Sequence, residues 1–132
     1  MEIVVDVSAI VAVLLNEPER PALELATMGH DLVSPACVAW ELGNALYGAI
    51  KRARIGVREA ISVFSEFNEI PLRQINIDVA SAIRIAATHK IPAYDAYYLE
   101  CARAQHASVL TLDARMLQVA AKMKIKTVEV FS

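Results

Sequence analysis

Short apolar runs alternate along the chain with longer segments of helical periodicity. The runs lack the apolar–polar alternation of a half-exposed strand, which predicts strands buried on both faces, as for Ile3-Val4-Val5. Pro71 and Arg73 weaken one of the runs, so its strand is expected at a sheet edge. We expect five strands, at residues 2–6, 31–33, 70–75, 108–112 and 127–131.

Helices are expected between these strands. Ser34-Pro35 is typical of a helix start, with Ser as the cap and Pro at the first position, and Asn76 is a second expected cap. The segment 36–54 is apolar around most of its circumference, so neighbouring elements are expected to cover it on more than one side. We expect helices at residues 9–15, 19–28, 36–54, 57–68, 77–89, 95–105 and 114–123.

Alternation of strands and helices predicts the fold class. Each strand–helix–strand unit makes its two strands parallel and lays the helix on a face of the sheet. We therefore predict an α/β fold, a three-layer α/β/α sandwich around a short, mainly parallel sheet of about five strands. The 132 residues suffice for one domain and not for two.

Composition excludes several classes of protein. No apolar run approaches the roughly 18 residues that span a membrane. The first residues are acidic and strand-like rather than basic, so we expect a cytoplasmic protein with no membrane association. Cys37 and Cys101 are expected to be reduced, buried thiols. A zinc site is not expected, because the spacing of His30, His89 and His106 matches none.

Four carboxylates stand where an apolar segment gives way to a turn or a helix. Asp6 and Asp113 follow the first and fourth expected strands, and ligands of open parallel sheets bind at that edge. Asp95 is expected at a helix start, where an acid is also an ordinary cap. Glu41 lies between Trp40 and Leu42 in an apolar helix, where a charge has no evident solvated face. Sequence position alone leaves open whether the four meet.

A shared site would need a cation, because carboxylates placed close together repel one another or take up a proton. Hard divalent ions prefer oxygen ligands, so such a ring suits Mg²⁺ or Mn²⁺. These ions make a coordinated water more acidic and neutralise charge on phosphate oxygens, which favours phosphodiester hydrolysis. Other chemistries lack their motifs: there is no Gly-rich phosphate loop and no Gly-x-Ser-x-Gly elbow, and Ser8 stands where an aspartyl-phosphate phosphatase needs a second Asp.

Two groups of basic residues could contact a phosphate backbone. The first contains Lys51, Arg52 and Arg54, with Arg58 close by, and follows the expected Glu41 helix, which makes it the better candidate for contacting a phosphate backbone. The second comprises three lysines between 122 and 126. Both are also explained as solvated helix ends that the helix dipole favours.

Over its whole length, 1–132, the chain resembles a single PIN-domain ribonuclease, and within that family the VapC-type toxins of prokaryotic toxin–antitoxin pairs. Four segments carry the resemblance. They are Val5-Asp6-Val7-Ser8-Ala9, Glu41-Leu42-Gly43-Asn44-Ala45-Leu46, Tyr94-Asp95-Ala96-Tyr97-Tyr98-Leu99 and Leu110-Thr111-Leu112-Asp113-Ala114-Arg115.

The resemblance implies a site and a mechanism. The family's metal-binding acids fall on the four carboxylates, and supporting or phosphate-contact positions fall on Ser8, Asn44 and Thr111. It further implies an endoribonuclease that uses Mg²⁺ or Mn²⁺ and leaves a 5′-phosphate on RNA, a homodimer, and a cognate VapB-like antitoxin whose C-terminal segment lies over the active cleft. The alternative is a catalytically weak PIN-like module whose acids hold metal without turnover and which acts by binding RNA or antitoxin.

Overall fold

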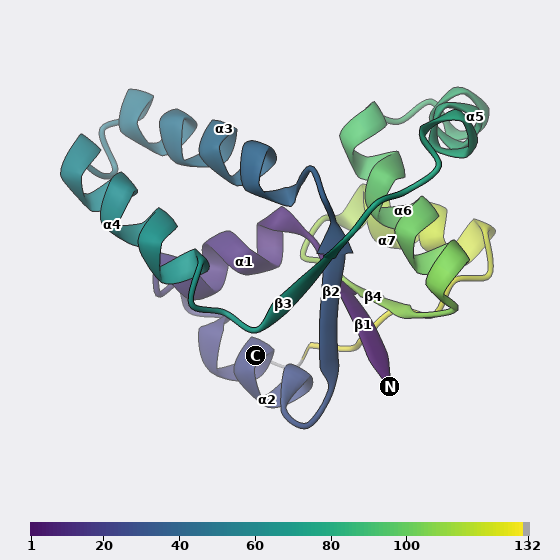
Figure 1. Ribbon diagram of the computed structural model, residues 1–132, viewed down its shortest axis with the longest axis horizontal. Helices are drawn as coiled ribbons and strands as arrows, with labels where there is room; N and C mark the ends of the chain where they lie inside the picture. The colour runs from purple at the N-terminus through teal and green to yellow at the C-terminus, as the bar shows by residue number, and fades with distance from the viewer. Residues whose placement is uncertain (131–132) are drawn as a thin grey trace.

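A parallel sheet with helices on both faces forms the molecule, which a computed structural model describes over residues 1–130 (Figure 1). The strands are β1 (Glu2–Val5), β2 (Asp31–Pro35), β3 (Leu72–Ile75) and β4 (Ser108–Leu110). The helices are α1 (Val7–Leu14), α2 (Arg20–Thr27), α3 (Val38–Lys51), α4 (Val57–Phe67), α5 (Val79–His89), α6 (Ala93–Gln105) and α7 (Ala114–Lys122). The predicted α/β class is confirmed.

All strand pairs of the sheet are parallel, in the order β3-β2-β1-β4, and Val4 of the central β1 pairs with Val33 and Val109. β3 lies at an edge, as its Pro71 and Arg73 predict. The expected fifth strand is reduced to a parallel bridge between Thr127 and Val109, so five strands is approximate. Its last expected residue, 131, lies outside the described residues.

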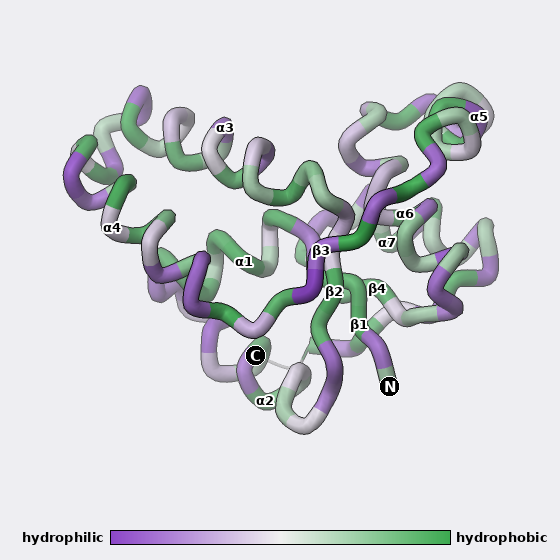
Figure 2. Tube along the Cα trace, in the orientation of Figure 1, coloured by the Kyte–Doolittle hydropathy of each residue, from purple (hydrophilic) through white to green (hydrophobic). Residues whose placement is uncertain are grey.

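Three layers result from this arrangement (Figure 1). One face of the sheet carries α1 and α2, with α3 and α4 packed side by side against α1; the other carries α6, flanked by α5 and α7. The hydropathy of the chain follows these layers, because α1 and the central strand β1 are mostly apolar, whereas the edge strand β3 is hydrophilic at its centre and α4 alternates (Figure 2). In residues 1–130 no helix combines the length and apolarity that crossing a membrane requires.

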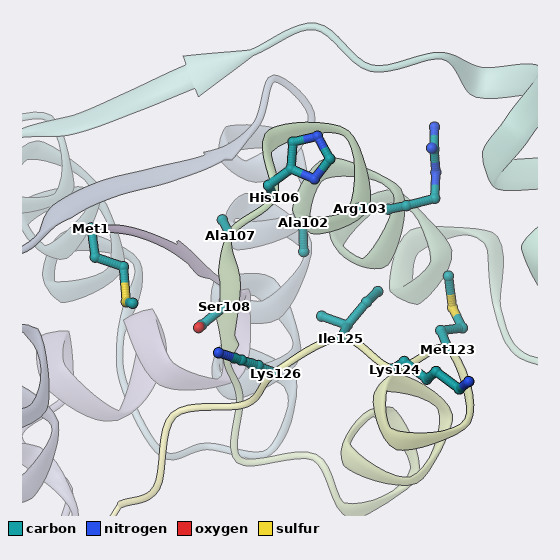
Figure 3. Close-up of a pocket in the computed structure, with 10 residues that line it drawn as sticks. All are labelled: Met1, Ala102, Arg103, His106, Ala107, Ser108, Met123, Lys124, Ile125 and Lys126. Atoms are coloured by element: carbon teal, nitrogen blue, oxygen red, sulfur yellow. The ribbon is translucent and has the colours of Figure 1, made fainter.

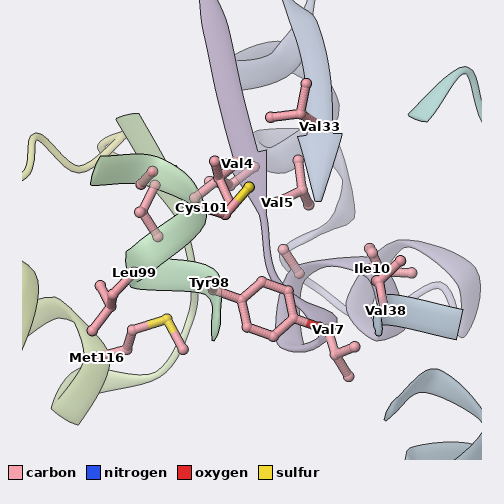
Figure 4. Packing of buried hydrophobic residues seen from close by; sticks show 14 of the residues in the cluster. Val4, Val5, Val7, Ile10, Val33, Val38, Tyr98, Leu99, Cys101 and Met116 are labelled. Carbon is pink, nitrogen blue, oxygen red and sulfur yellow. The ribbon is translucent and has the colours of Figure 1, made fainter. Parts of the chain in front are cut away.

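The core is formed where α6 crosses the sheet (Figure 4). Leu99 contacts the α7 side of the molecule near Met116, Cys101 lies against the strands, and Tyr98 reaches toward Val7 of α1. All are fully or almost fully buried. Cys101 is thus a free, buried thiol, as expected, whereas Cys37 is free but only partly buried.

Two predicted helix starts are wrong. Ser34 and Pro35 belong to β2, and α3 begins at Val38 after Cys37. The Ser34 hydroxyl donates to the Val5 carbonyl of the neighbouring strand instead of capping a helix. The cap of α5 is Asp78 rather than Asn76, with the Asp78 carboxylate accepting from the Ala80 amide at 3.2 Å.

α3 packs against both α1 and α4 and is therefore covered on more than one side, as expected, but it also keeps one exposed face. The Trp40 side chain is 75% exposed and Tyr47 is 60% exposed, so one face of α3 is apolar and open to solvent. Leu42 and Leu46 occupy the opposite, buried face. The apolar residues of α3 therefore belong partly to the core and partly to a face that no other helix or strand of the described chain covers.

Candidate active site

Asp6 ends β1 and caps α1. Its backbone is extended, and its carboxylate is 3% exposed. Oδ1 accepts from the Ser8 hydroxyl at 2.7 Å and from the Ala9 amide at 3.1 Å, and Oδ2 accepts from the Thr111 hydroxyl. Burial raises the pKa of Asp6, although these hydrogen bonds oppose the shift by favouring the ionised form. Asp6 is therefore a buried carboxylate held in one orientation.

Ser8 and Thr111 join the ends of β1 and β4. Each hydroxyl donates to Asp6 and accepts from a backbone amide beyond β4, Ser8 from Leu112 at 2.9 Å and Thr111 from Asp113 at 3.0 Å. A hydroxyl can donate one bond and accept others, so both donor and acceptor capacity are used. The two residues fix the segment that carries Asp113 relative to Asp6.

Asp113 is the N-cap of α7. Its Oδ1 accepts from the backbone amides of Arg115 at 2.8 Å and Met116 at 3.3 Å. This satisfies helix-terminal donors that would otherwise lack partners. The cap anchors the carboxylate at the edge of the sheet beside Asp6, whose pKa it raises through charge repulsion.

Asp95 lies in the first turn of α6 and its side chain is 15% exposed. Oδ2 accepts from Arg115 Nη2 at 3.0 Å. Burial and repulsion from Asp113 raise the pKa of Asp95, and the Arg115 guanidinium lowers it less. Asp95 is therefore close enough to Asp113 to be repelled by it, and the Arg115 side chain at the start of α7 is its positively charged partner.

Glu41 is half-buried in the first turn of α3, and its Oε2 atom is buried without a hydrogen-bond partner among residues 1–130. Desolvation raises its pKa to about 7, with repulsion from Asp6 and Asp95 adding to the shift. The Tyr98 hydroxyl of α6 lowers the pKa from close by, yet it too is buried without a partner in hydrogen-bond geometry. Glu41 thus presents an unsatisfied acceptor beside two other carboxylates.

These interactions connect all four predicted acids. Asp6 is coupled to Asp113 and Glu41, and Asp95 is coupled to Asp113 and Glu41. They lie at the carboxyl ends of β1 and β4 and at the starts of α3, α6 and α7. Within residues 1–130, however, no three acidic, His or Cys side chains already stand in an arrangement that holds a metal ion.

The donor set nevertheless fits a hard divalent cation. All donors are carboxylate oxygens, the acids repel one another, and Glu41 Oε2 is a buried acceptor that lacks a donor. A cation would offset both the repulsion and the unsatisfied acceptor. Asp6 accepts from the Thr111 hydroxyl and Asp95 from the Arg115 guanidinium.

Asn44 is placed outside this carboxylate cluster. It is exposed on α3, one turn after Glu41, and lines a groove between α1 and α3 together with the first basic group, Lys51, Arg52 and Arg54. Lys51 Nζ lies 5.7 Å from the centre of the Tyr47 ring. Arg54 pairs with Glu17 at 3.3 Å. The groove combines basic, amide and aromatic side chains and leads away from the Glu41 helix start.

The second basic group lies at the opposite end of the sheet. Lys124 and Lys126 line a hollow beside Met1, Arg103 and Ser108, at the amino ends of β1 and β4 (Figure 3). Lys122 occupies the last turn of α7. The helix dipole explains cations at such an end, and none of them is near the four acids.

Sequence reasoning missed two residues of the cluster, Tyr98 and Arg115. Tyr98 follows Asp95 by three positions, which places both on one side of a helix, and that spacing could have indicated it. No sequence signal pairs Arg115 with Asp95, because the contact joins two different helices. Both residues touch predicted acids from elements that only the fold brings together.

Comparison with known proteins places this architecture. The chain is 27% identical over 123 residues to Ribonuclease VapC3 of Pyrobaculum aerophilum, covering 89% of this chain and 94% of that one. The structure of VapBC-1 from nontypeable Haemophilus influenzae has a TM-score of 0.69 at 16% identity, with 98% of both chains covered. That of VapBC2 from Rickettsia felis, bound to a DNA fragment from their promoter, has a TM-score of 0.68 at 15% identity, covering 99% and 100%.

The two structural likenesses concern the fold, which they match over nearly the entire chain. The family model of the PIN domain matches residues 3–122, a range that contains all four acids and both hydroxyl residues that contact Asp6. The chain belongs to the PIN domain family.

Proposed function

We propose that the whole chain, 1–132, is one PIN domain that acts as a metal-dependent endoribonuclease toxin in the cytoplasm, neutralised by a cognate VapB-like antitoxin. The observation that carries the proposal is the coupled cluster of four carboxylates, in which Glu41 Oε2 is buried without a partner. RNA is the substrate class because the relative from Pyrobaculum aerophilum is a ribonuclease and shares 27% identity over nearly its full length.

Asp6, Glu41, Asp95 and Asp113 would hold Mg²⁺ or Mn²⁺. Such an ion, when bound, supplies an acidified water and neutralises charge on the phosphate oxygens during hydrolysis. Ser8 and Thr111 keep the Asp6 carboxylate oriented through their hydroxyl bonds, so it pays no reorganisation cost when the substrate arrives. Asp113 is held equally firmly by its amide bonds.

The groove between α1 and α3 would bind the RNA backbone. Lys51, Arg52 and Arg54 line it with Asn44, one turn beyond Glu41 on the same helix. Lysine and arginine contacts to phosphate confer affinity without sequence choice. The RNA strand would then run along α3 toward the four acids.

The partners in this proposal are a second copy of the chain and the antitoxin. Contiguous exposed apolar residues mark interfaces. Trp40, immediately before Glu41, lines a hollow with Val79 and Tyr97, and α4 exposes Ile61. The similar structures from Haemophilus influenzae and Rickettsia felis are VapBC structures, which supports an antitoxin as a partner, and we place it over this region.

Cleavage of structured RNA by the purified, partner-free protein tests the activity. Cleavage is expected with Mg²⁺ or Mn²⁺ and not in EDTA, and Asp6→Asn should abolish it. Asp31→Asn is the matched control, because Asp31 is exposed at the amino end of β2 and should leave the rate unchanged. Cleavage that persists in EDTA, or in the Asp6→Asn variant, would contradict the mechanism.

One observation favours a different candidate, a PIN-like binding module that neither holds metal nor turns over: within residues 1–130 the acids do not stand in a metal-holding arrangement, and Arg115 pairs with Asp95. Such a module would bind RNA or antitoxin with the same affinity in the presence and absence of metal, and no cleavage would be seen. Metal-dependent binding without cleavage would support a weak enzyme of the same site.

Light scattering tests the assembly. A mass of two chains is expected for the free protein, and a larger one with antitoxin. Trp40→Ser should weaken one of these associations, whereas Leu25→Ser, an equally exposed apolar residue on α2, should not. Equal behaviour of both variants would remove Trp40 from the interface.

A further inference from the structure

Arg115 is the one cation that forms an ion pair with a candidate acid in residues 1–130. The other four ion pairs in this range lie elsewhere, and join Arg20 to Glu24, Arg54 to Glu17, Arg73 to Glu2 and Arg103 to Glu100. Arg115 Nη2 stands 3.0 Å from Asp95 Oδ2. A single guanidinium therefore stands beside a cluster of four carboxyl groups.

The position of Arg115 is fixed by the same cluster. Its backbone amide donates to Asp113 Oδ1 at 2.8 Å, while its side chain crosses from α7 to Asp95 on α6. The residue thus contacts two of the four acids, one through the backbone and one through the guanidinium. Its placement at the site does not depend on the ion pair alone.

The ion pair is asymmetric in exposure. The Arg115 side chain is 53% exposed and that of Asp95 is 15% exposed. Exposed pairs are weak, since water screens them and the long side chain loses freedom. The guanidinium can leave Asp95 for solvent at little cost, whereas the carboxylate stays where it is.

Asp95 Oδ2 cannot serve Arg115 and a divalent cation equally well. A metal ligand oxygen lies much closer to its ion than a hydrogen-bond acceptor lies to a guanidinium, and two cations at one oxygen repel. Divalent metal and Arg115 therefore compete for Asp95. A guanidinium released there remains tethered beside the acids by the Asp113 cap.

We propose that Arg115 competes with the divalent cation for Asp95 and, once displaced, binds a phosphate oxygen of the RNA at the cleavage site. This rests on the proposed function. A planar guanidinium donates two parallel bonds to a phosphate, which suits it better than any other side chain for that contact. Arg115 would thereby couple metal uptake to substrate binding, because the same group opposes the first and assists the second.

Metal titration tests the competition without any cleavage. Mn²⁺ binding, followed from the spectrum of the free ion by electron paramagnetic resonance, should tighten about two- to fivefold in Arg115→Gln, the change expected from loss of an exposed ion pair. Arg73→Gln is the matched control, because Arg73 is also a half-exposed arginine paired with a carboxylate, on the edge strand. It should leave the Mn²⁺ affinity unchanged.

A double-mutant cycle separates the contact from a general charge effect. In an Asp95→Asn background the gain from Arg115→Gln should disappear, since Arg115 then has no carboxylate to occupy. A gain that persists there would mean that Arg115 acts only through its distant charge, and the competition would be overturned. An unchanged or weaker Mn²⁺ affinity in Arg115→Gln alone would overturn it as well.

RNA binding tests the phosphate contact. In an Asp6→Asn background, which prevents cleavage, and at a Mn²⁺ concentration that the titration shows to saturate this variant, Arg115→Gln should weaken RNA binding and lower the slope of its salt dependence by about one. Arg115→Lys keeps the charge and should restore the slope but only part of the affinity. An unchanged slope in Arg115→Gln would overturn the contact.

Failure of this inference is distinguishable from failure of the proposed function. If the native chain binds Mn²⁺ and cleaves RNA while Arg115→Gln behaves like Arg73→Gln, only the role of Arg115 is lost. If the native chain binds no Mn²⁺ at millimolar concentration, both the metal site and the inference that depends on it are overturned. Thermal unfolding of each variant verifies that it is folded.

Discussion

The Tyr98 hydroxyl and Glu41 Oε2 face a common interior between α6 and α3, and neither atom has a hydrogen-bond partner in the part of the chain that the structure describes. Each affects the other: the hydroxyl lowers the pKa of Glu41, and the carboxylate raises the pKa of Tyr98. Unsatisfied buried polar atoms are costly in a folded protein. Because these two unsatisfied atoms lie together, a ligand that supplied their missing partners would stabilise this part of the cluster.

Replacing Tyr98 by Phe should separate these effects. Loss of an unpartnered hydroxyl should change the free energy of unfolding by less than about 1 kcal/mol. Loss of its influence should raise the pKa of Glu41 further above 7, so the low-pH limb of the cleavage profile should move to higher pH. Denaturant unfolding and the pH profile measure the two effects, with the half-exposed Tyr94→Phe as control. If the pH profile of cleavage does not move, Tyr98 contributes only to packing and does not influence the pKa of Glu41.

The stability of the metal-free protein should fall as pH rises from about 4.5 to 7. Glu41 binds its proton more tightly in the folded chain, with a pKa of about 7 against 4.5, and the pKa values of Asp6 and Asp95 are also raised. The folded state therefore binds more protons than the unfolded state in this window, and each proton lost weakens folding. After allowance for solvent screening, Glu41 should contribute about 2 kcal/mol of this loss.

Denaturant unfolding in EDTA at pH 5 and pH 8 measures this dependence. Glu41→Gln should be more stable than the native chain at pH 8 and similar to it at pH 5. Glu59→Gln, an exposed acid on α4, should follow the native chain at both. A native chain more stable at pH 8 than at pH 5 would contradict the raised pKa values.

Thr111 should be needed to keep Asp6 ionised and oriented. Thr111→Val removes the donor to Asp6 Oδ2 and the acceptor for the Asp113 amide, leaving a buried carboxylate and a backbone group short of partners. The expected loss of stability is about 1–3 kcal/mol at pH 7. Thr111→Ser keeps the hydroxyl and should recover most of it, and Thr127→Val, at an exposed position, should have little effect. Equal unfolding midpoints for Thr111→Val and the native chain would count against this role.

Sequence patterns located the acids better than they located the elements around them. Asp6 could be predicted because an uninterrupted apolar run ends at it, and Asp113 because it follows a second such run. Ser34-Pro35 wrongly predicted a helix start, because the local sequence does not show that the Ser34 hydroxyl bonds to the Val5 carbonyl of another strand. The proximity of Glu41 to Asp95, and of Asp95 to Arg115, depends on contacts between helices far apart in sequence.

Divalent metal should raise the melting temperature by relieving repulsion among the acids. Asp95→Asn should reduce that gain without making the metal-free protein less stable, because ionised Asp95 is disfavoured by burial and by Asp113, and its Arg115 pair is exposed. Thermal unfolding at pH 7.5 with EDTA or with millimolar Mg²⁺ measures both effects. Asp31→Asn should keep the full gain. The absence of any metal-dependent shift in the native chain would argue against a shared site.

Within the first basic group, Arg52 should contribute more to RNA binding than Arg54. Arg52 lies over Gly48 within the groove, with Nη1 3.2 Å from where a β-carbon would stand, whereas Arg54 is paired with Glu17. Arg52→Ala should therefore lower the salt dependence of binding by about one unit of slope, as loss of one phosphate contact does, and Arg54→Ala by less. Lys124→Ala, at the opposite end of the sheet, should leave the slope unchanged. Fluorescence anisotropy over a range of salt concentrations in the Asp6→Asn background compares the three. Equal slopes for Arg52→Ala and Lys124→Ala would mean that the first basic group is only a solvated helix end and does not contact RNA phosphate.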